Sequence, residues 1–190
     1  MENKKAIFVC GSGGSGKTRF AGENFPEYTK INVDSIYENL LIKNGLGLKI
    51  LSFNEEEAKK AYVLFEDAKK INNDMFFETS KSGNNMVIDG IGRDPEILLG
   101  QREYLSRLGY DTYLIMLYAD LDLCIKRVEQ RERIYKKNIT VDSWYLSYSN
   151  IPLYKKEFND NFLLICTDKE HQSKGLDEIK CSNRNKKRIL

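Results

Sequence analysis

The segment from Gly11 to Thr18 constrains this chain more than any other part of its sequence. It reads Gly-Ser-Gly-Gly-Ser-Gly-Lys-Thr and fits the pattern G-x-x-x-x-G-K-[ST] at every fixed position. The apolar run Ala6–Cys10 before it predicts a buried strand, and residues 16 to about 24 after it predict a helix that ends before Pro26. A glycine-rich turn between a strand and a helix is the context in which this pattern forms a phosphate-binding loop.

The residue types of this loop suit the binding of phosphate groups. Glycines let backbone N–H groups approach phosphates closely, and the start of a helix adds partial positive charge. We expect Lys17 to reach the β- and γ-phosphates of ATP, and the hydroxyl of Thr18 to bind Mg²⁺. The predicted nucleotide-binding residues are Gly11, Ser12, Gly13, Gly14, Ser15, Gly16, Lys17 and Thr18.

Further apolar runs predict an α/β protein with a parallel sheet covered on both faces. Ser35 with Glu38, and Asn54 with Glu57, resemble helix capping boxes, and Asp94-Pro95 predicts another helix start. Apolar residues at helical spacing continue from position 58 to 77. The predicted strands after the first are residues 30–33, 86–89, 113–118 and 162–166.

Composition narrows the classes of protein to consider. A chain of 190 residues fits one domain, and its net charge of +2 gives no sign of a nucleic-acid or membrane protein. It has no apolar stretch long enough to span a membrane, and its first residues do not resemble a signal peptide. The four cysteines form no Cys-x-x-Cys pair, which favours reduced thiols. We therefore expect a cytoplasmic protein without zinc.

Two acidic residues follow predicted strands at the edge of the sheet where ligands bind. Asp89 ends the run Met86–Asp89 and is expected to hold Mg²⁺, either directly or through water; the alternative is an Asp that caps a turn. Asp34 follows the second strand and is expected to orient an acceptor hydroxyl and take its proton. It could instead cap a helix, although Ser35 and Glu38 already offer a cap.

Four arginines are candidates for contacts with phosphates or with an acceptor. Arg127, Arg131 and Arg133 follow the fourth strand and are expected to form a lid over the phosphates, unless they pair with neighbouring acids on a solvated helix face. Arg93 lies just beyond the third strand, where its guanidinium could bind an acceptor, or could pair with Asp94 instead.

Three stretches together resemble the P-loop kinase superfamily with nucleoside-monophosphate-kinase-like architecture: residues 11–18, 31–34 and the Arg127-x-x-x-Arg131-x-Arg133 pattern. The general appearance is similar to that of phage-type small kinases, polynucleotide 5′-hydroxyl kinases and zeta-toxin-like kinases. The resemblance covers roughly residues 6–166 and implies a three-layer sandwich with five parallel strands in the order 2-3-1-4-5. It implies a single domain over residues 1–179, with acceptor-binding helices at 35–80, a lid at about 125–145, and a basic tail at 180–190.

The same resemblance assigns roles to individual residues. It makes Asp34 the general base for the acceptor and makes the three lid arginines phosphate ligands. The stretch Asp89-Gly-Ile-Gly-Arg93 is similar to the Asp-Gly-Phe-Pro-Arg stretch of adenylate kinases, in which the arginine holds the acceptor nucleotide. Here Gly92 replaces the proline, so the identity of the acceptor does not transfer.

Three classes of function remain open. The first is an ATP-dependent kinase acting on a nucleoside, a nucleotide, a nucleic-acid 5′-hydroxyl or a nucleotide sugar. The second is a GTPase switch, which the stretch Asp89–Gly92 fits but which lacks an N-K-x-D segment to bind guanine. The third is an ATPase or nucleotide-binding module without an acceptor, which requires Asp34 to be structural. The sequence shows no obligate protein partner.

Overall fold

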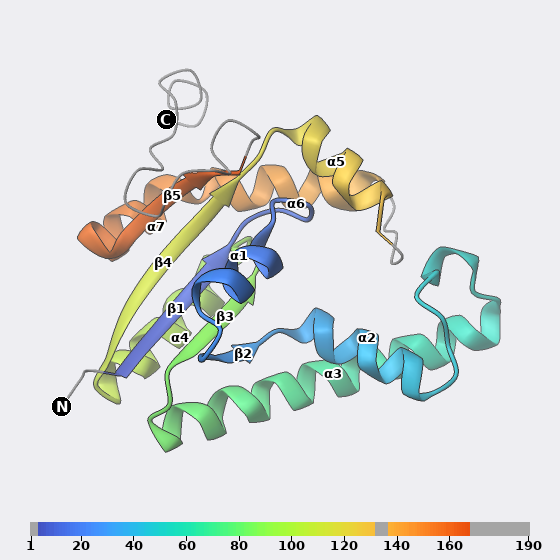
Figure 1. Ribbon diagram of the computed structural model, residues 1–190, viewed down its shortest axis with the longest axis horizontal. Coiled ribbons are helices and arrows are strands. Elements are labelled where there is room, and N and C mark those ends of the chain that lie inside the picture. The colour runs from blue at the N-terminus through green and yellow to red at the C-terminus, as the bar shows by residue number, and fades with distance from the viewer. Residues whose placement is uncertain (1–3, 132–136, 168–190) are drawn as a thin grey trace.

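A computed structural model describes residues 4–131 and 137–167. A sheet with the order β2-β3-β1-β4-β5, parallel at every pairing, forms the middle layer (Figure 1). Helices cover both of its faces, so the predicted three-layer α/β sandwich and its strand order are confirmed. The strands are β1 (Lys4–Cys10), β2 (Thr29–Ile31), β3 (Met86–Gly90), β4 (Tyr110–Tyr118) and β5 (Phe162–Cys166).

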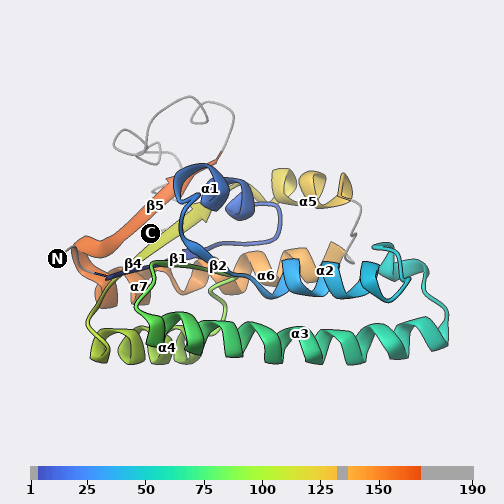
Figure 2. The same cartoon turned by 60° about the horizontal axis from the view of Figure 1, so that its bottom comes forward.

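Side chains of the central strand β1 alternate between two hydrophobic clusters. Ala6, Phe8 and Cys10 face a cluster that takes in buried residues of α3, α4, α6 and α7, while Ile7 and Val9 face one that includes α1. Figure 2 shows α1 and α5 on one side of the sheet and α3, α4, α6 and α7 on the other. The helices are α1 (Lys17–Asn24), α2 (Val33–Lys43), α3 (Glu55–Ser82), α4 (Pro95–Arg107), α5 (Leu121–Glu129), α6 (Lys137–Ser149) and α7 (Ile151–Phe158).

Helices α2 and α3 form a hairpin that extends beyond the sheet (Figure 1). Their facing sides bury a third cluster, which includes Tyr37, Leu41 and Ala68. The side chain of Asn54 accepts from the backbone of Glu57, whose carboxylate accepts in return from the backbone of Asn54, so the predicted capping box at the start of α3 is confirmed. The hairpin therefore packs as a unit of its own beside the main core.

The second capping prediction was wrong. Strand β2 ends at Ile31, where its pairing with β3 ends, and α2 already begins at Val33. Asn32 is the N-cap, because its side chain accepts from the backbone N–H of Ser35. Asp34 thus lies in the first turn of α2 and not at a strand end.

Other predictions have mixed outcomes. Asp94 caps α4 and Pro95 opens it, as predicted. Cys10 and Cys124 are free and buried, as the prediction of reduced thiols requires. Within residues 4–131 and 137–167, no helix combines the length and the apolar character needed to cross a bilayer. Arg133 and the tail at 180–190 lie outside the described residues.

Candidate functional site

The loop between β1 and α1 can form only because two of its positions carry no side chain. A Cβ on Gly11 would lie 2.4 Å from the carbonyl oxygen of Leu117 in β4. Gly14 has a φ of +81°, and a Cβ there would lie 2.4 Å from the carbonyl oxygen of Cys124 in α5. The loop is therefore pressed against β4 and α5, which fixes the position of its backbone.

The loop offers polar groups that have no partner in the described part of the protein. The amides of Gly13, Gly14 and Gly16 donate to no group there, and Gly16 precedes α1 without a side-chain cap. The hydroxyl of Ser15 is also buried without a partner. Unpaired N–H groups at a helix N-terminus form an anion site, so this arrangement fits a phosphate group.

Lys17 begins α1 and folds its side chain back over the loop. Its ammonium group donates to the carbonyl oxygens of Gly11 and Ser12, each at 2.9 Å. The loop thereby holds a positive charge beside its unpaired amides. A bound polyphosphate would meet both kinds of donor together.

Asp89 lies at the end of β3, next to the strand that leads into the loop. Its Oδ2 accepts from the amide of Asn32 at 2.7 Å and from the hydroxyl of Thr18 at 3.5 Å. Burial raises the pKa of Asp89; the charge of Lys17 opposes this rise, and that of Asp34 adds to it. Three segments that are distant in the sequence thus meet at one carboxylate.

The neighbourhood of Asp89 and Thr18 fits Mg²⁺ bound together with a nucleotide. One carboxylate and one hydroxyl are the few oxygen ligands that Mg²⁺ takes from a protein when phosphates and water supply the rest. Among the described residues, no group of three or more histidines, cysteines, aspartates or glutamates could hold a metal by itself. The residues present therefore suit a Mg²⁺ ion that is bound as a complex with the phosphates of a nucleotide.

Asn32 is a site residue that the sequence analysis missed. Its Oδ1 caps α2, and its Nδ2 holds the Asp89 carboxylate. Asp34, two positions later, is exposed in the first turn of α2, and its charge acts on Asp89. One short segment therefore positions both of the predicted acidic residues.

The arginines predicted to form the lid differ in their surroundings. Arg127 donates to the carbonyl oxygen of Gly14 at 3.2 Å, and to the hydroxyl and carbonyl oxygens of Thr167 at 3.2 and 2.9 Å. Arg131 is exposed just beyond α5, and its charge lowers the pKa of Asp89 after the larger effects of burial, Lys17, Asp34 and Thr18. Arg127 therefore braces the loop, whereas Arg131 is the described lid arginine whose side chain is exposed.

Arg93 lies in the connection between β3 and α4, and its side chain is exposed. Asn150 donates to the carbonyl oxygens of Gly92 and Arg93, each at 3.1 Å, and Tyr154 donates to that of Gly92 at 2.9 Å. The carboxylate of Asp94, which could have paired with Arg93, accepts from the backbone N–H of Ile97 as the N-cap of α4. The segment α6–α7 thus fixes the backbone that carries Arg93.

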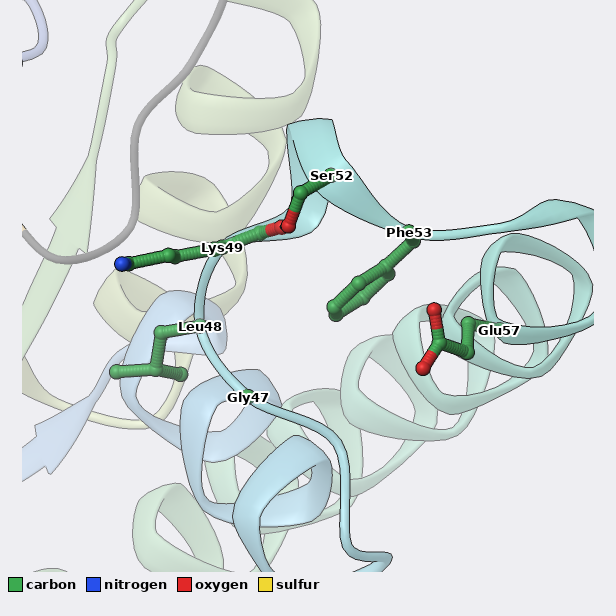
Figure 3. A pocket seen from close by; sticks show the side chains of 6 residues that line it. All are labelled: Gly47, Leu48, Lys49, Ser52, Phe53 and Glu57. Atoms are coloured by element: carbon green, nitrogen blue, oxygen red, sulfur yellow. The ribbon is translucent and has the colours of Figure 1, made fainter.

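Aromatic residues near the site serve mainly in packing. Tyr37 and Phe76 are buried, and Trp144 and Tyr148 pack against each other and against Tyr118. Phe53 lies over a hollow of about 450 Å³ in the α2–α3 connection, opposite the carboxylate of Glu57 (Figure 3). Figure 1 shows the α2–α3 connection, which carries these residues, at the end of the hairpin farthest from the sheet.

The fold and the loop together define a P-loop protein of the kinase type. A family model described as an AAA domain matches residues 7–146, and the chain belongs to that family. No curated protein matches the sequence.

Solved structures with the same fold are distant in sequence. A chain of the PezAT chromosomal toxin–antitoxin system of Streptococcus pneumoniae is 17% identical, with a TM-score of 0.60 over 100% of this chain and 78% of that chain. A putative kinase from Chloroflexus aurantiacus is 12% identical, with a TM-score of 0.60 over 91% and 93%. A chain of the AvrRxo1-ORF1:ORF2 complex with ATP is 15% identical, with a TM-score of 0.66 over 90% and 56%.

Proposed function

We propose that this protein is a phosphotransferase that uses ATP with Mg²⁺ and transfers the γ-phosphoryl group to an acceptor hydroxyl. One observation carries the proposal: the phosphate loop, the Thr18–Asp89 pair and the acidic start of α2 meet at one edge of the sheet. These groups would bind the phosphates, hold the metal and orient the acceptor. The kinase-type fold of the relatives and the ATP complex of one of them support the assignment.

Each residue has a proposed task. The amides of Gly13–Thr18 bind the phosphates, and Lys17 neutralises charge on the β- and γ-phosphates. Thr18 and Asp89 hold Mg²⁺, which would draw charge from the transferred group. Asp34 orients the acceptor oxygen and takes its proton. Arg131 or Arg133 closes over the phosphates from the lid and limits hydrolysis, while Arg127 braces the loop beneath them.

The proposed acceptor is a nucleoside, a nucleotide or a nucleic-acid 5′-hydroxyl, with a nucleotide sugar as the alternative. In this account residues 35–80 form the acceptor-binding insertion, residues 125–145 the lid, and Arg93 an acceptor contact. A chain of the Pnkp1/Rnl/Hen1 RNA repair complex, 16% identical with a TM-score of 0.57 over 85% of this chain and 48% of that chain, supports including a nucleic acid among the acceptors. The toxin–antitoxin neighbour supports including the zeta-toxin-like alternative.

A second candidate function is an ATPase or nucleotide-binding module without an acceptor. One observation favours it: Asp34 lies in the first turn of α2, where a carboxylate stabilises a helix whether or not it takes part in chemistry. In that case Asp34 would have no catalytic task.

Transfer of labelled γ-phosphate separates the two functions. The wild-type chain is incubated with ATP, Mg²⁺ and single members of a panel of nucleosides, nucleoside monophosphates, 5′-hydroxyl oligonucleotides and nucleotide sugars. The proposal predicts a labelled product with one class of acceptor. Slow release of inorganic phosphate at the same rate with every member of the panel would contradict it.

A further inference from the structure

The peptide unit between Gly11 and Ser12 is held at both of its polar atoms. Its carbonyl oxygen accepts from the ammonium group of Lys17 at 2.9 Å, and its N–H donates to the hydroxyl of Tyr148 at 3.4 Å. The orientation of this peptide plane therefore sets one of the two carbonyl oxygens that hold Lys17. Any group that fixes the plane also acts on Lys17.

Tyr148 is well placed to fix this plane. It lies on α6, is buried, and its hydroxyl donates to the carbonyl oxygen of Leu117 at 2.8 Å while accepting from Ser12. Its ring packs against Tyr118 and Trp144, so the hydroxyl cannot move without repacking. Burial raises the pKa of Tyr148, and the hydroxyl keeps the proton that it donates.

A second contact from the same helix acts on the same peptide segment. The hydroxyl of Ser147 donates to the carbonyl oxygen of Ile91 at 2.5 Å, and the N–H of Gly11 donates to that oxygen at 3.3 Å. Ile91 lies two positions after Asp89. Helix α6 thus contacts both the phosphate loop and the segment that follows the metal-binding carboxylate.

We propose that Tyr148 is a positioning residue for Lys17, acting through the Gly11–Ser12 peptide. The hydroxyl of Tyr148 satisfies the N–H of Ser12 from one side, so that the carbonyl oxygen of Gly11 stays directed at Lys17. Ser147 secures the preceding peptide through Ile91. The inference rests on the proposed function only in that Lys17 is taken to bind the phosphates of ATP.

The test compares two buried tyrosines that each lose only a hydroxyl. Tyr148→Phe removes the hydrogen bonds to Ser12 and Leu117, whereas Tyr154→Phe removes a partly buried hydrogen bond to the carbonyl oxygen of Gly92. Affinity for ATP with Mg²⁺ is measured by calorimetry at a temperature where both variants are folded. Where an acceptor has been found, kcat and the KM of the acceptor are measured as well.

We expect Tyr148→Phe to weaken ATP binding about tenfold and to lower kcat with little change in the KM of the acceptor, since one hydrogen bond orients Lys17. Tyr154→Phe should also lose thermal stability, because it loses a hydrogen bond, yet bind ATP within about twofold of the wild type. Equal affinity losses in both variants, or none in Tyr148→Phe, would overturn the inference.

Calorimetry measures ATP binding and needs no acceptor, so the inference about Tyr148 can be tested separately from the proposed transfer reaction. A wild-type chain that binds ATP but transfers no phosphate contradicts the proposed function, while the comparison of the two tyrosines still decides the inference. A wild-type chain that does not bind ATP overturns both. Ser147→Ala gives a second check, because it should weaken ATP binding without removing any aromatic packing.

Discussion

Asn32 allows the geometry of the site to be tested through stability alone. Its side chain makes two separate contacts, as the cap of α2 and as the donor to Asp89. Asn32→Ala removes both. Loss of a cap costs about 1 kcal/mol, and loss of a hydrogen bond to a charged group costs about 1.5–3 kcal/mol. The free energy of unfolding should therefore fall by about 3 kcal/mol, which corresponds to a fall in Tm of roughly 6–12 °C for a chain of this size.

Asn32→Ser separates the two contacts, because serine caps a helix about as well as asparagine but has no amide to reach Asp89. It should lose about 2 kcal/mol and lie between the wild type and Asn32→Ala. Thermal and urea unfolding followed by circular dichroism measure both variants. In an Asp89→Ala background, Asn32→Ser should cost little, because its partner is gone. If Asn32→Ala unfolded at the temperature of the wild type, the described contacts would have to be wrong.

Three further changes test other parts of the site. Gly14→Ala should destabilise the protein by several kcal/mol, because the left-handed backbone costs about 1–2 kcal/mol and the added carbon meets the backbone of Cys124. Gly100→Ala should instead stabilise it by up to about 1 kcal/mol, because Gly100 lies inside α4 with open space around it. Urea unfolding measures both variants. Arg127→Lys should lower stability by about 1–3 kcal/mol in the same assay, because an ammonium group cannot reproduce the fork that contacts Gly14 and Thr167. Lys17→Ala should weaken ATP binding at least about tenfold in calorimetry, and equal affinity in this variant would contradict the assigned phosphate contact.

Most of the fold could be predicted from the sequence because its signals are local. Apolar runs such as Ala6–Cys10 and Phe162–Cys166 gave strands at those positions, and Asp94-Pro95 marked the start of α4. The order of the strands followed from the resemblance carried by residues 11–18, residues 31–34 and the arginine pattern of the lid. It could not have been obtained from the apolar runs alone, because pairing is set by contacts distant in the sequence.

The start of α2 shows where local signals compete. Asn32 and Ser35 both precede an apolar helical pattern, and the spacing of Ser35 and Glu38 matches a capping box. The helix begins at the earlier position because β2 stops pairing with β3 after Ile31, which frees the chain to turn at Asn32. The end of a strand pairing is a tertiary property, so the sequence did not reveal Asn32 as a site residue.

The contacts that hold the phosphate loop could not be predicted from the sequence, because they join residues that are far apart along the chain. Tyr148 and Ser12 are 136 positions apart, and Arg127 and Thr167 are 40 apart. The ring of Tyr148 packs against Tyr118 and Trp144, but a sequence pattern does not show which backbone group its hydroxyl contacts. Such contacts become visible only when the sheet brings β1, β4 and α6 together.

The central claim is that Asp34 directs an acceptor hydroxyl toward the γ-phosphate of ATP. The most direct test compares Asp34→Asn with Asp122→Asn, an exposed acid at the same position in the first turn of α5. Both variants lose the same favourable interaction with a helix N-terminus. The two residues differ in that the charge of Asp34 acts on Asp89. The account predicts that Asp34→Asn binds ATP normally but forms no labelled acceptor product, while Asp122→Asn transfers at the wild-type rate. Near-normal transfer by Asp34→Asn would contradict the account.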